Sequence, residues 1–427
     1  MPLLVLLFPF QVAAAAPGAT ATLTIDDAVG TALANHPDVV AAGAQIEIAD
    51  AQARQARAPL LPQLDLTGRY GYSWTDSGSA TNATADSSSG DSYSATLSGG
   101  LLLWDFGQSA NRWRSAKAAT AAAEGDAETV RQTTILNARL AFLDALETRA
   151  LIQVARETLT NQERHLGQTE EFVRIGTRPV IDLAKLRTQV AAAKAALIRA
   201  DNDHLTAKAR LNRAMGVSRS LDYEVAPAPL PPLADENRPT AELYAATIGL
   251  RPEHTAQLAS IRGQEASVRA ARAWLLPSLH LGTDAGYSGR DFGDPVLGAT
   301  VGVTLSWTLL DGLSSPAAAD AAGAQLTVQR SRLTGVEQQV WEEIEEARIA
   351  VASSRAELEA AELGVGSARD LLRLAEERYA AGVGNSLELS DAQLELASAS
   401  AQRVRSEFDV AAARAQLLRA LGRRDWR

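Results

Sequence analysis

Three acidic residues follow the two points at which long stretches without proline are interrupted. The first interruption is "RIGTRPVIDLAKL", residues 174–186, which contains Asp182. The second is "AAGVGNSLELSDAQ", residues 380–393, which contains Glu388 and Asp391. Carboxylates placed close together repel one another and attract cations, whereas a carboxylate in the first turn of a helix is favoured by the helix dipole. Both interpretations, a cation-attracting cluster and helix capping, remain open from the residues alone.

The other residues that could carry chemistry favour no enzyme. The five histidines, at positions 36, 165, 204, 254 and 280, have no ligand spacing, and cysteine is absent, so we expect no metal site, no cofactor and no disulfide. The sequence has no Ser-His-Asp order and no phosphate-binding glycine loop. With 41 basic and 51 acidic residues the net charge is −10, which argues against a nucleic-acid partner.

The chain repeats itself, and the repeat defines the elements that must position these acids. "APLLPQLDL", from Ala58, matches "AWLLPSLHL", 215 residues later, and Gly176 matches Gly382 at a spacing of 206 residues. The difference of nine residues falls in the polar run between Trp74 and Tyr93. Matched Pro, Gly and Asp positions predict a tandem duplication, in which each half runs helix, two strands, long helix, break and returning helix.

Strict alternation of apolar and polar residues predicts two β-hairpins, at about 63–105 and about 278–309. The clearest strand has one face formed by Ala299, Val301, Val303, Leu305, Trp307 and Leu309. Each strand has about 11 residues, the length that a tilted strand needs to cross a bilayer. A half-buried sheet in a soluble sandwich would show the same alternation.

Aromatic residues lie at both ends of these strands. Trp104, Trp274 and Trp307 lie at the helix-proximal ends, and Trp74 and Tyr93 lie near the loops. Two aromatic girdles that flank an apolar band are typical of outer-membrane barrels. Four strands cannot close a barrel, so a membrane sheet would need several copies of the chain.

The absence of proline predicts two very long helices, at about 108–175 and about 315–381, and two returning helices, at about 179–215 and about 386–422. Ser315 fits the N-cap of the second long helix, and Pro316 fits its first position. Helices of this length rise about 100 Å. Apolar residues three and four apart after the first break indicate a coiled-coil seam.

These elements give a domain plan. Residues 1–21 resemble a signal peptide, residues 22–216 form the first structural repeat and residues 241–427 the second. The Pro-rich segment 217–240 is the predicted linker between them.

Four motifs carry a family resemblance: "ALANHPDV" from Ala32, "ARAPLLPQL" from Ala56, "LLWDFG" from Leu102 and "RYAAGVGNSLELSDAQLELASA" from Arg378. With the duplicated plan, they resemble the TolC-like outer-membrane efflux proteins over essentially the whole mature chain. The resemblance implies a mixed α and β membrane protein: a homotrimeric 12-stranded β-barrel, with four strands per protomer, continued by a long periplasmic α-helical barrel. Lipid-anchored relatives carry an N-terminal Cys. Since this sequence has no cysteine, it resembles the unacylated branch.

The function that the resemblance implies is a passive export duct of a tripartite efflux pump or type I secretion system in a Gram-negative outer membrane. Its implied partners are two further copies of the chain, a periplasmic adaptor protein, an inner-membrane RND, ABC or MFS transporter and outer-membrane lipid. A secreted or periplasmic coiled-coil scaffold or adaptor without channel activity is the alternative.

The resemblance also assigns roles to residues around the two breaks. Asp182, Glu388 and Asp391 match acids at the periplasmic constriction of the pore. Tyr379 matches a residue that ties neighbouring helix pairs in the closed state; the basic partner would fall at Gly384, so Arg178 is the candidate substitute. Adaptor contacts are expected at Gly176, Thr177 and Gly382, although glycine is also the usual residue at the end of a helix.

Overall fold

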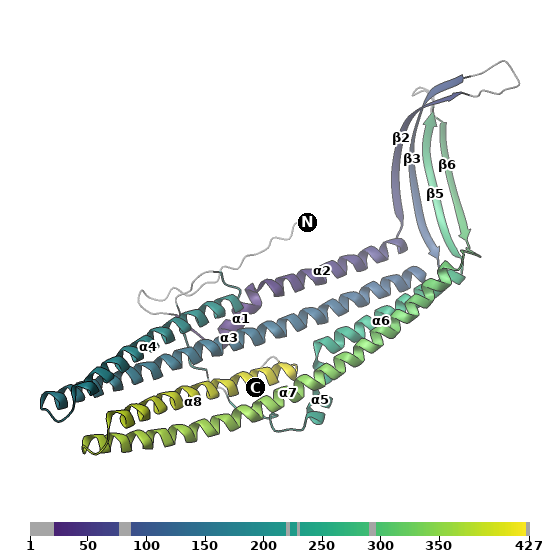
Figure 1. The fold of residues 1–427 in the computed structure, drawn as a ribbon. Coiled ribbons are helices and arrows are strands. Elements are labelled where there is room, and N and C mark those ends of the chain that lie inside the picture. Colours follow the sequence, from purple (N-terminus) through teal and green to yellow (C-terminus); the bar gives the residue numbers. More distant parts are fainter. Residues whose placement is uncertain (1–20, 77–86, 219–222, 229–230, 290–295, 424–427) are drawn as a thin grey trace. The chain divides into compact units, whose positions relative to one another are not determined.

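The computed structural model describes residues 21–76, 87–218, 223–228, 231–289 and 296–423 (Figure 1). The first half contains β1 (Ala21–Leu23), α1 (Ile25–Asn35), α2 (Pro37–Arg57), β2 (Gln63–Asp76), β3 (Ser87–Trp104), α3 (Gln108–Arg174) and α4 (Val180–Ala214). The second half contains α5 (Thr240–Thr247), α6 (Pro252–Arg272), β5 (Ser278–Gly289), β6 (Val296–Ser306), α7 (Ser314–Ala380) and α8 (Ser386–Ala420), and β4 (Tyr223–Val225) lies in the segment that joins the halves. Apart from Ala21, the expected signal peptide lies outside the described residues, as do residues 77–86 of the polar run.

The chain forms two compact units, which are described separately. The turn unit comprises Met1–Ala42, Ala127–Pro252 and Glu337–Arg427, and it contains the α3–α4 and α7–α8 turns. The strand unit comprises Gly43–Asp126 and Glu253–Val336, and it contains the large sheet. Helices α3 and α7 therefore contribute residues to both units.

The large sheet has four antiparallel strands in the order β2-β3-β5-β6, which lie side by side in Figure 1. The two halves of the chain meet between β3 and β5, where Leu101 pairs with Leu281 and a bulge follows between Leu102 and Trp104. Among the described strands, β2 and β6 form the two edges. The apolar side chains of these edge strands are exposed: Leu64, Leu66, Tyr70, Tyr72, Trp74, Val301, Val303 and Leu305. The alternation in the sequence therefore corresponds to an uncovered apolar face.

A carboxylate precedes each of the helices α3 and α7 and accepts hydrogen bonds from backbone N–H groups at or near the start of the helix. Asp105 accepts hydrogen bonds from the backbone N–H groups of Gly107 (3.0 Å) and Ser109 (2.6 Å). Asp311 accepts one from Ser315 (2.9 Å), so α7 begins at Ser314. The expectation that Ser315 is the N-cap and Pro316 the first helical residue is therefore wrong. Asp311 already satisfies the Ser315 N–H, and Pro316 lies in the first turn, where its missing donor is not needed.

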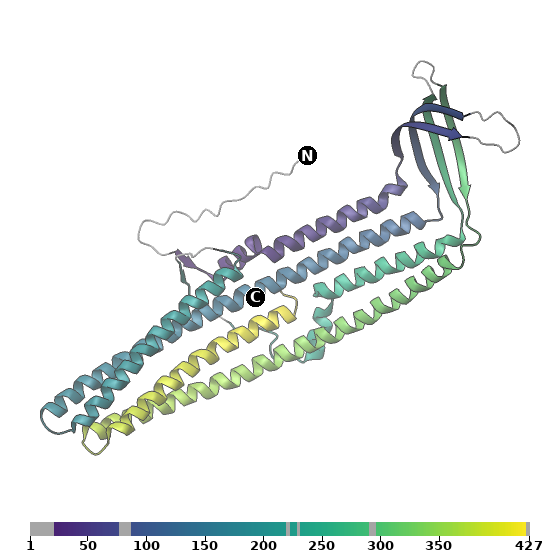
Figure 2. The same ribbon diagram turned by 45° about the horizontal axis from the view of Figure 1, so that its top comes forward.

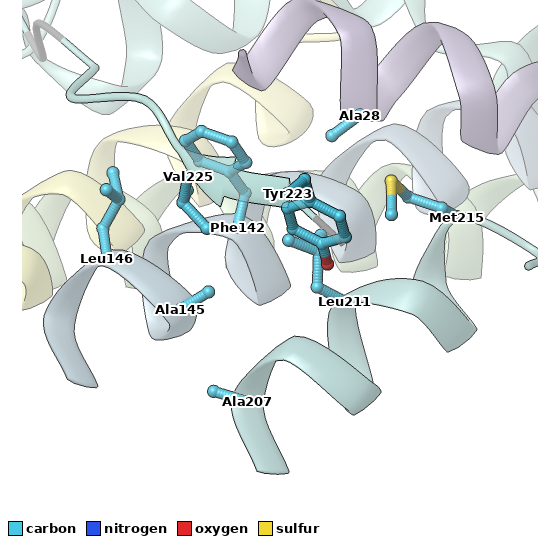
Figure 3. Close-up of a cluster of buried hydrophobic side chains, with 9 residues drawn as sticks. All are labelled: Ala28, Phe142, Ala145, Leu146, Ala207, Leu211, Met215, Tyr223 and Val225. Carbon is cyan, nitrogen blue, oxygen red and sulfur yellow. The ribbon is translucent and has the colours of Figure 1, made fainter. Parts of the chain in front are cut away.

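The core of the turn unit gathers around a short parallel pairing of β1 with β4 (Figure 3). Tyr223 on β4 donates its hydroxyl hydrogen to Asn212 on α4 (3.0 Å), and burial raises the pKa of this phenol to about 12. The cluster consists of Ala28, Phe142, Ala145, Leu146, Ala207, Leu211, Met215, Tyr223 and Val225. It joins the start of the chain to α3 and α4.

Candidate functional site: the two helix turns

Both turns are built by the same helix ending. At the end of α3, Gly176 has φ +80°, its N–H donates to Val173 O (3.0 Å), and Thr177 N–H donates to Phe172 O (3.0 Å). At the end of α7, Gly382 has φ +77° and makes the equivalent bond to Tyr379 O (3.1 Å). This left-handed glycine ending satisfies helical carbonyls that would otherwise lack donors. Two equivalent stops in the sequence thus become two equivalent turns.

Arg178 connects the two turns. Its guanidinium donates to the carbonyl oxygens of Gly384 (3.2 Å) and Tyr379 (2.9 Å), and its Cζ lies 4.3 Å from the centroid of the Tyr379 ring. A charged donor to two carbonyls combined with a cation–π contact is a strong local interaction. Figure 2 shows the two turns side by side. The structure therefore brings the predicted pair Arg178 and Tyr379 together within one chain.

The ring of Tyr379 packs in a buried cluster of residues from α3, α7 and α8. Only 5% of its surface is exposed, its hydroxyl lies 3.2 Å from Thr169 Oγ1, and its ring meets Phe172 edge to face at 6.3 Å. Leu389 and Ala392 of α8 complete the contact. Since the ring is fixed by α3, α7 and α8, it offers Arg178 a rigid surface.

The three candidate acids have different surroundings. Asp182 accepts a hydrogen bond from Ser386 Oγ (2.8 Å), which adds a second link between the turns. Glu388 forms an ion pair with Arg378 (2.9 Å), and its backbone N–H donates to the Asn385 side chain (2.8 Å). Asp391 is exposed and, within the part of the chain that the structure describes, forms no ion pair. Asp391 is therefore the least compensated of the three charges.

Asp391 lies on a groove of about 590 Å³ between α3, α4 and α8. Alanine is the most frequent residue of the walls, and Gln189, Ser390 and Arg405 are among the polar side chains. Ser390 donates to Gln189 Oε1 (3.1 Å) and joins α8 to α4. Because many of the lining side chains are small, the space between these helices stays unfilled next to Asp391.

Sequence reasoning missed a buried histidine next to the turns. His165 on α3 is 5% exposed, and its Nε2 lies 3.3 Å from Glu376 Oε1 on α7. Burial lowers the pKa of His165, while the Glu376 carboxylate opposes that shift. Histidine spacing along the chain gives no signal for this pair, because the partner is a glutamate on another helix. Only the register of α3 against α7 could have identified it.

The predicted adaptor-contact residues Gly176, Thr177 and Gly382 are all exposed at the turns. The two glycines have no side chain, and the Thr177 hydroxyl donates to Phe172 O (2.9 Å), so the turns offer mainly backbone and shape.

The predicted girdle residues lie in the strand unit and differ in exposure. Trp74, Trp104 and Trp307 are well exposed, and Trp274 is half-buried. Tyr93 is only 8% exposed, because its ring lies against Gly289 of β5, where a side chain would collide with it. Its ring therefore covers Gly289, and Tyr93 is less exposed than the tryptophans.

The comparison with known families identifies the class of protein. The model of the outer membrane efflux protein family matches residues 28–217 and 243–423, that is, most of both halves. The chain belongs to this family and is accordingly an outer-membrane channel protein of an efflux or export system. The resemblance predicted from the motifs is confirmed. Within the described residues, no helix is both long and apolar enough to cross a membrane.

Individual relatives agree with this assignment. The pyoverdine export outer membrane protein OpmQ of Pseudomonas putida is 26% identical, over 95% of this chain and 87% of that protein. The toluene efflux pump outer membrane protein TtgC of Pseudomonas putida is 24% identical, over 92% of this chain and 82% of that protein. The solved outer-membrane channel OprN shares the fold with a TM-score of 0.82 at 20% identity, over 94% of this chain and 90% of that one.

Proposed function

We propose that three copies of this chain form a passive export duct through the outer membrane. The supporting observation is the sheet of the strand unit, which has an exposed apolar face and two edges, β2 and β6, without a partner among the described strands. An unpaired strand edge is not tolerated in lipid, so neighbouring copies must complete the ladder. Four strands from each of three copies make a 12-stranded barrel, a size within the known range of such barrels.

The long helices continue this barrel as a tube in the periplasm. Alanine-rich faces on α4 and α8 allow neighbouring helices to pack closely and flatly, as a tube wall requires. The two turns form the inner end, where exposed Gly176, Thr177 and Gly382 contact a periplasmic adaptor. An inner-membrane transporter of the RND, ABC or MFS type supplies the energy and selects the cargo, and the duct itself performs no catalysis.

Acids around the turns narrow this end of the pore. A threefold axis brings three copies of each carboxylate together, which concentrates cations and makes the closed channel cation-selective. We assign the dominant field to Asp391, because Asp182 is bound by Ser386 and Glu388 is paired with Arg378. The Arg178–Tyr379 contact holds the two turns of a protomer together in the closed form.

The alternative, a periplasmic coiled-coil scaffold or adaptor, explains the helices but not the exposed sheet. Membership of an outer-membrane family, matched in both halves, also favours the duct.

The experiment that tests the duct combines localisation, mass and conductance. Outer-membrane fractions should contain the protein as an assembly of three mature chains, and the purified assembly should give discrete cation-selective conductance in planar bilayers. Recovery as a water-soluble monomer without conductance would contradict the duct and favour the scaffold.

A further inference from the structure

Basic residues gather where three helices of the strand unit join the strands. This basic band consists of Arg57, Arg112, Arg114, Lys117, Arg269 and Arg272, all of them exposed. Its members end α2, begin α3 and end α6. The stretches 54–57, 108–117 and 269–272 contain no acidic residue, although the chain as a whole carries a net charge of −10. Positive charge is therefore concentrated at the strand-proximal ends of α2, α3 and α6.

Helix stability accounts for only part of the band. Arginines in the last turns of α2 and α6 interact favourably with the negative end of the helix dipole. Arg112, Arg114 and Lys117 lie beyond the first turn of α3, which begins at Gln108, so the dipole of α3 does not stabilise them. The helix dipoles therefore give no reason for these three cations, and an external anion would interact favourably with them.

Arg57 and Lys117 both lie close to the ring of Trp113. Arg57 Cζ lies 5.5 Å and Lys117 Nζ 6.0 Å from the centroid of the indole ring, and all three residues line a groove of about 390 Å³ between α2 and α3. Neither cation forms an ion pair within the described residues. The groove thus offers two uncompensated cations on a flat aromatic surface.

The acids of the groove lie farther from the strands. Asp50 is paired with Arg54 (3.3 Å), and Glu124 lies two helical turns beyond Lys117. The strand-proximal end of the groove therefore remains positive.

The position of this end relative to the sheet identifies the ligand. β2 begins at Gln63, six residues after Arg57, and its exposed apolar residues follow at once. Exposed Trp104 and Trp307 mark the same helix-proximal end of the strands, and tryptophan is typical of the membrane interface. Cations just outside an apolar band, with aromatic residues between, lie at the depth of lipid headgroups.

We infer that the groove between α2 and α3 binds the phosphate of an anionic phospholipid in the periplasmic leaflet of the outer membrane. Arg57 donates hydrogen bonds to the phosphate oxygens, Lys117 supplies a second positive charge, and Trp113 holds both side chains at the interface. The other four cations of the basic band add attraction for the anionic surface. This inference depends on the outer-membrane location of the sheet.

The test uses the full-length assembly in lipid nanodiscs of phosphatidylethanolamine, with and without phosphatidylglycerol. We expect the native assembly to enrich phosphatidylglycerol among its bound lipids, as measured by native mass spectrometry, and the enrichment to fall as ionic strength rises. The double variant Arg57→Gln/Lys117→Gln removes two surface cations per chain and should bind phosphatidylglycerol roughly thirty-fold more weakly.

A matched variant controls for the loss of charge. Arg262→Gln/Arg332→Gln removes two exposed cations from the same unit, but Arg262 lies about 15 Å along α6 from Arg272. It should keep the native preference for phosphatidylglycerol. Equal binding by the native assembly and the groove variant would overturn the inference.

A second measurement separates a lipid site from a site in the pore. A groove variant with altered anion conductance in bilayers of neutral lipid, but unchanged lipid binding, would place the groove on the lumen and overturn the inference. An assembly that inserts and conducts without any lipid preference contradicts the lipid site alone. A native chain that does not insert contradicts the duct as well.

Discussion

At the residue scale, Arg178 contacts Tyr379, for which the family resemblance implies a basic partner on the opposite turn. The position expected to be basic is Gly384, where an added Cβ would lie 3.0 Å from Tyr379 N and 3.1 Å from Arg378 Cβ. A side chain there would crowd the end of α7, whereas glycine leaves its carbonyl open to a donor. Arg178 donates to that carbonyl from the first turn and also contacts the Tyr379 ring.

Replacement of Arg178 should loosen the closed turns. Arg178→Gln removes the charged donor to two carbonyls and the cation–π contact, and should weaken the contact between the turns by about 2 kcal/mol. We expect longer open periods in single-channel recordings. Arg174→Gln is the control, because within the described residues the ion-pair partner of Arg174 is Glu171, one turn away on α3. If the two variants have the same open lifetimes, Arg178 does not hold the gate.

The acids should differ in their effect on selectivity. Asp391→Asn removes an exposed carboxylate without an ion-pair partner among the described residues, so block by a trivalent cation should weaken by about tenfold. Glu388→Gln should change block less, since Arg378 at 2.9 Å already offsets that charge. Reversal potentials and block constants in planar bilayers measure both effects. Equal changes in the two variants would contradict the assignment to Asp391.

At the scale of elements, the long-range pattern of the sequence was informative and the local contacts were not. Runs without proline and the stops at Gly176 and Gly382 correspond to α3, α4, α7 and α8, because proline and left-handed glycine act through the backbone. The alternation of apolar and polar residues corresponds to the strands, because successive side chains of a strand point to opposite faces of the sheet.

Features that depend on tertiary contacts were not predictable. Ser315 resembled an N-cap, but its backbone N–H donates to the carboxylate of Asp311, four residues earlier. Tyr93 resembled the exposed aromatic residues, but the missing side chain at Gly289 accommodates its ring. β1 and β4 are three residues each and pair across about 200 positions, so no short window of sequence reveals them. The proximity of Arg178 to Tyr379 was suggested by resemblance, whereas its carbonyl partners come from the fold.

Packing of α3 against α7 should depend on pH through His165. Its folded pKa lies below the ordinary value because it is buried, although Glu376 opposes the shift; Gln168 and Arg164 are the other groups around it. A lowered folded pKa gives stability that is present above about pH 6.5 and is lost as the pH falls through the folded pKa. The thermal midpoint of the assembly should therefore fall as the pH drops from about 6.5 toward 5.

His165→Gln should flatten that fall. Burial also lowers the pKa of His204, so the single variant should remove part of the pH dependence and His165→Gln/His204→Gln more of it. Exposed His280 on β5 provides the control variant His280→Gln, which should retain the native slope. An unchanged slope in the double variant would assign the acid sensitivity to other groups.

At the scale of the whole molecule, the two halves share a backbone plan but the segment between them belongs to neither. Glu236 in this segment is buried, with its side chain 4% exposed. It accepts hydrogen bonds from Arg414 on α8 (2.9 Å), Arg355 on α7 (3.2 Å) and the backbone N–H of Leu233 (3.3 Å). The two halves are similar, and these hydrogen bonds attach Glu236 of the connecting segment to α7 and α8 of the second half. The Pro-rich composition predicts a linker, yet one buried acid makes it a fixed part of the turn unit.

Removal of the Glu236 charge should release the segment. Glu236→Gln breaks the ion pair with Arg414, in which both side chains are largely buried, and breaking such a pair costs about 3–5 kcal/mol. Amide hydrogen exchange around Leu233 should accelerate by about 100-fold or more, because each 1.4 kcal/mol of local opening is worth a factor of ten. The control Glu242→Gln alters an exposed pair with Arg238, which is worth at most about 1 kcal/mol, and should leave exchange nearly unchanged. Native-like protection in Glu236→Gln would show that the aliphatic contacts of the segment, rather than this buried charge, hold it against α7 and α8.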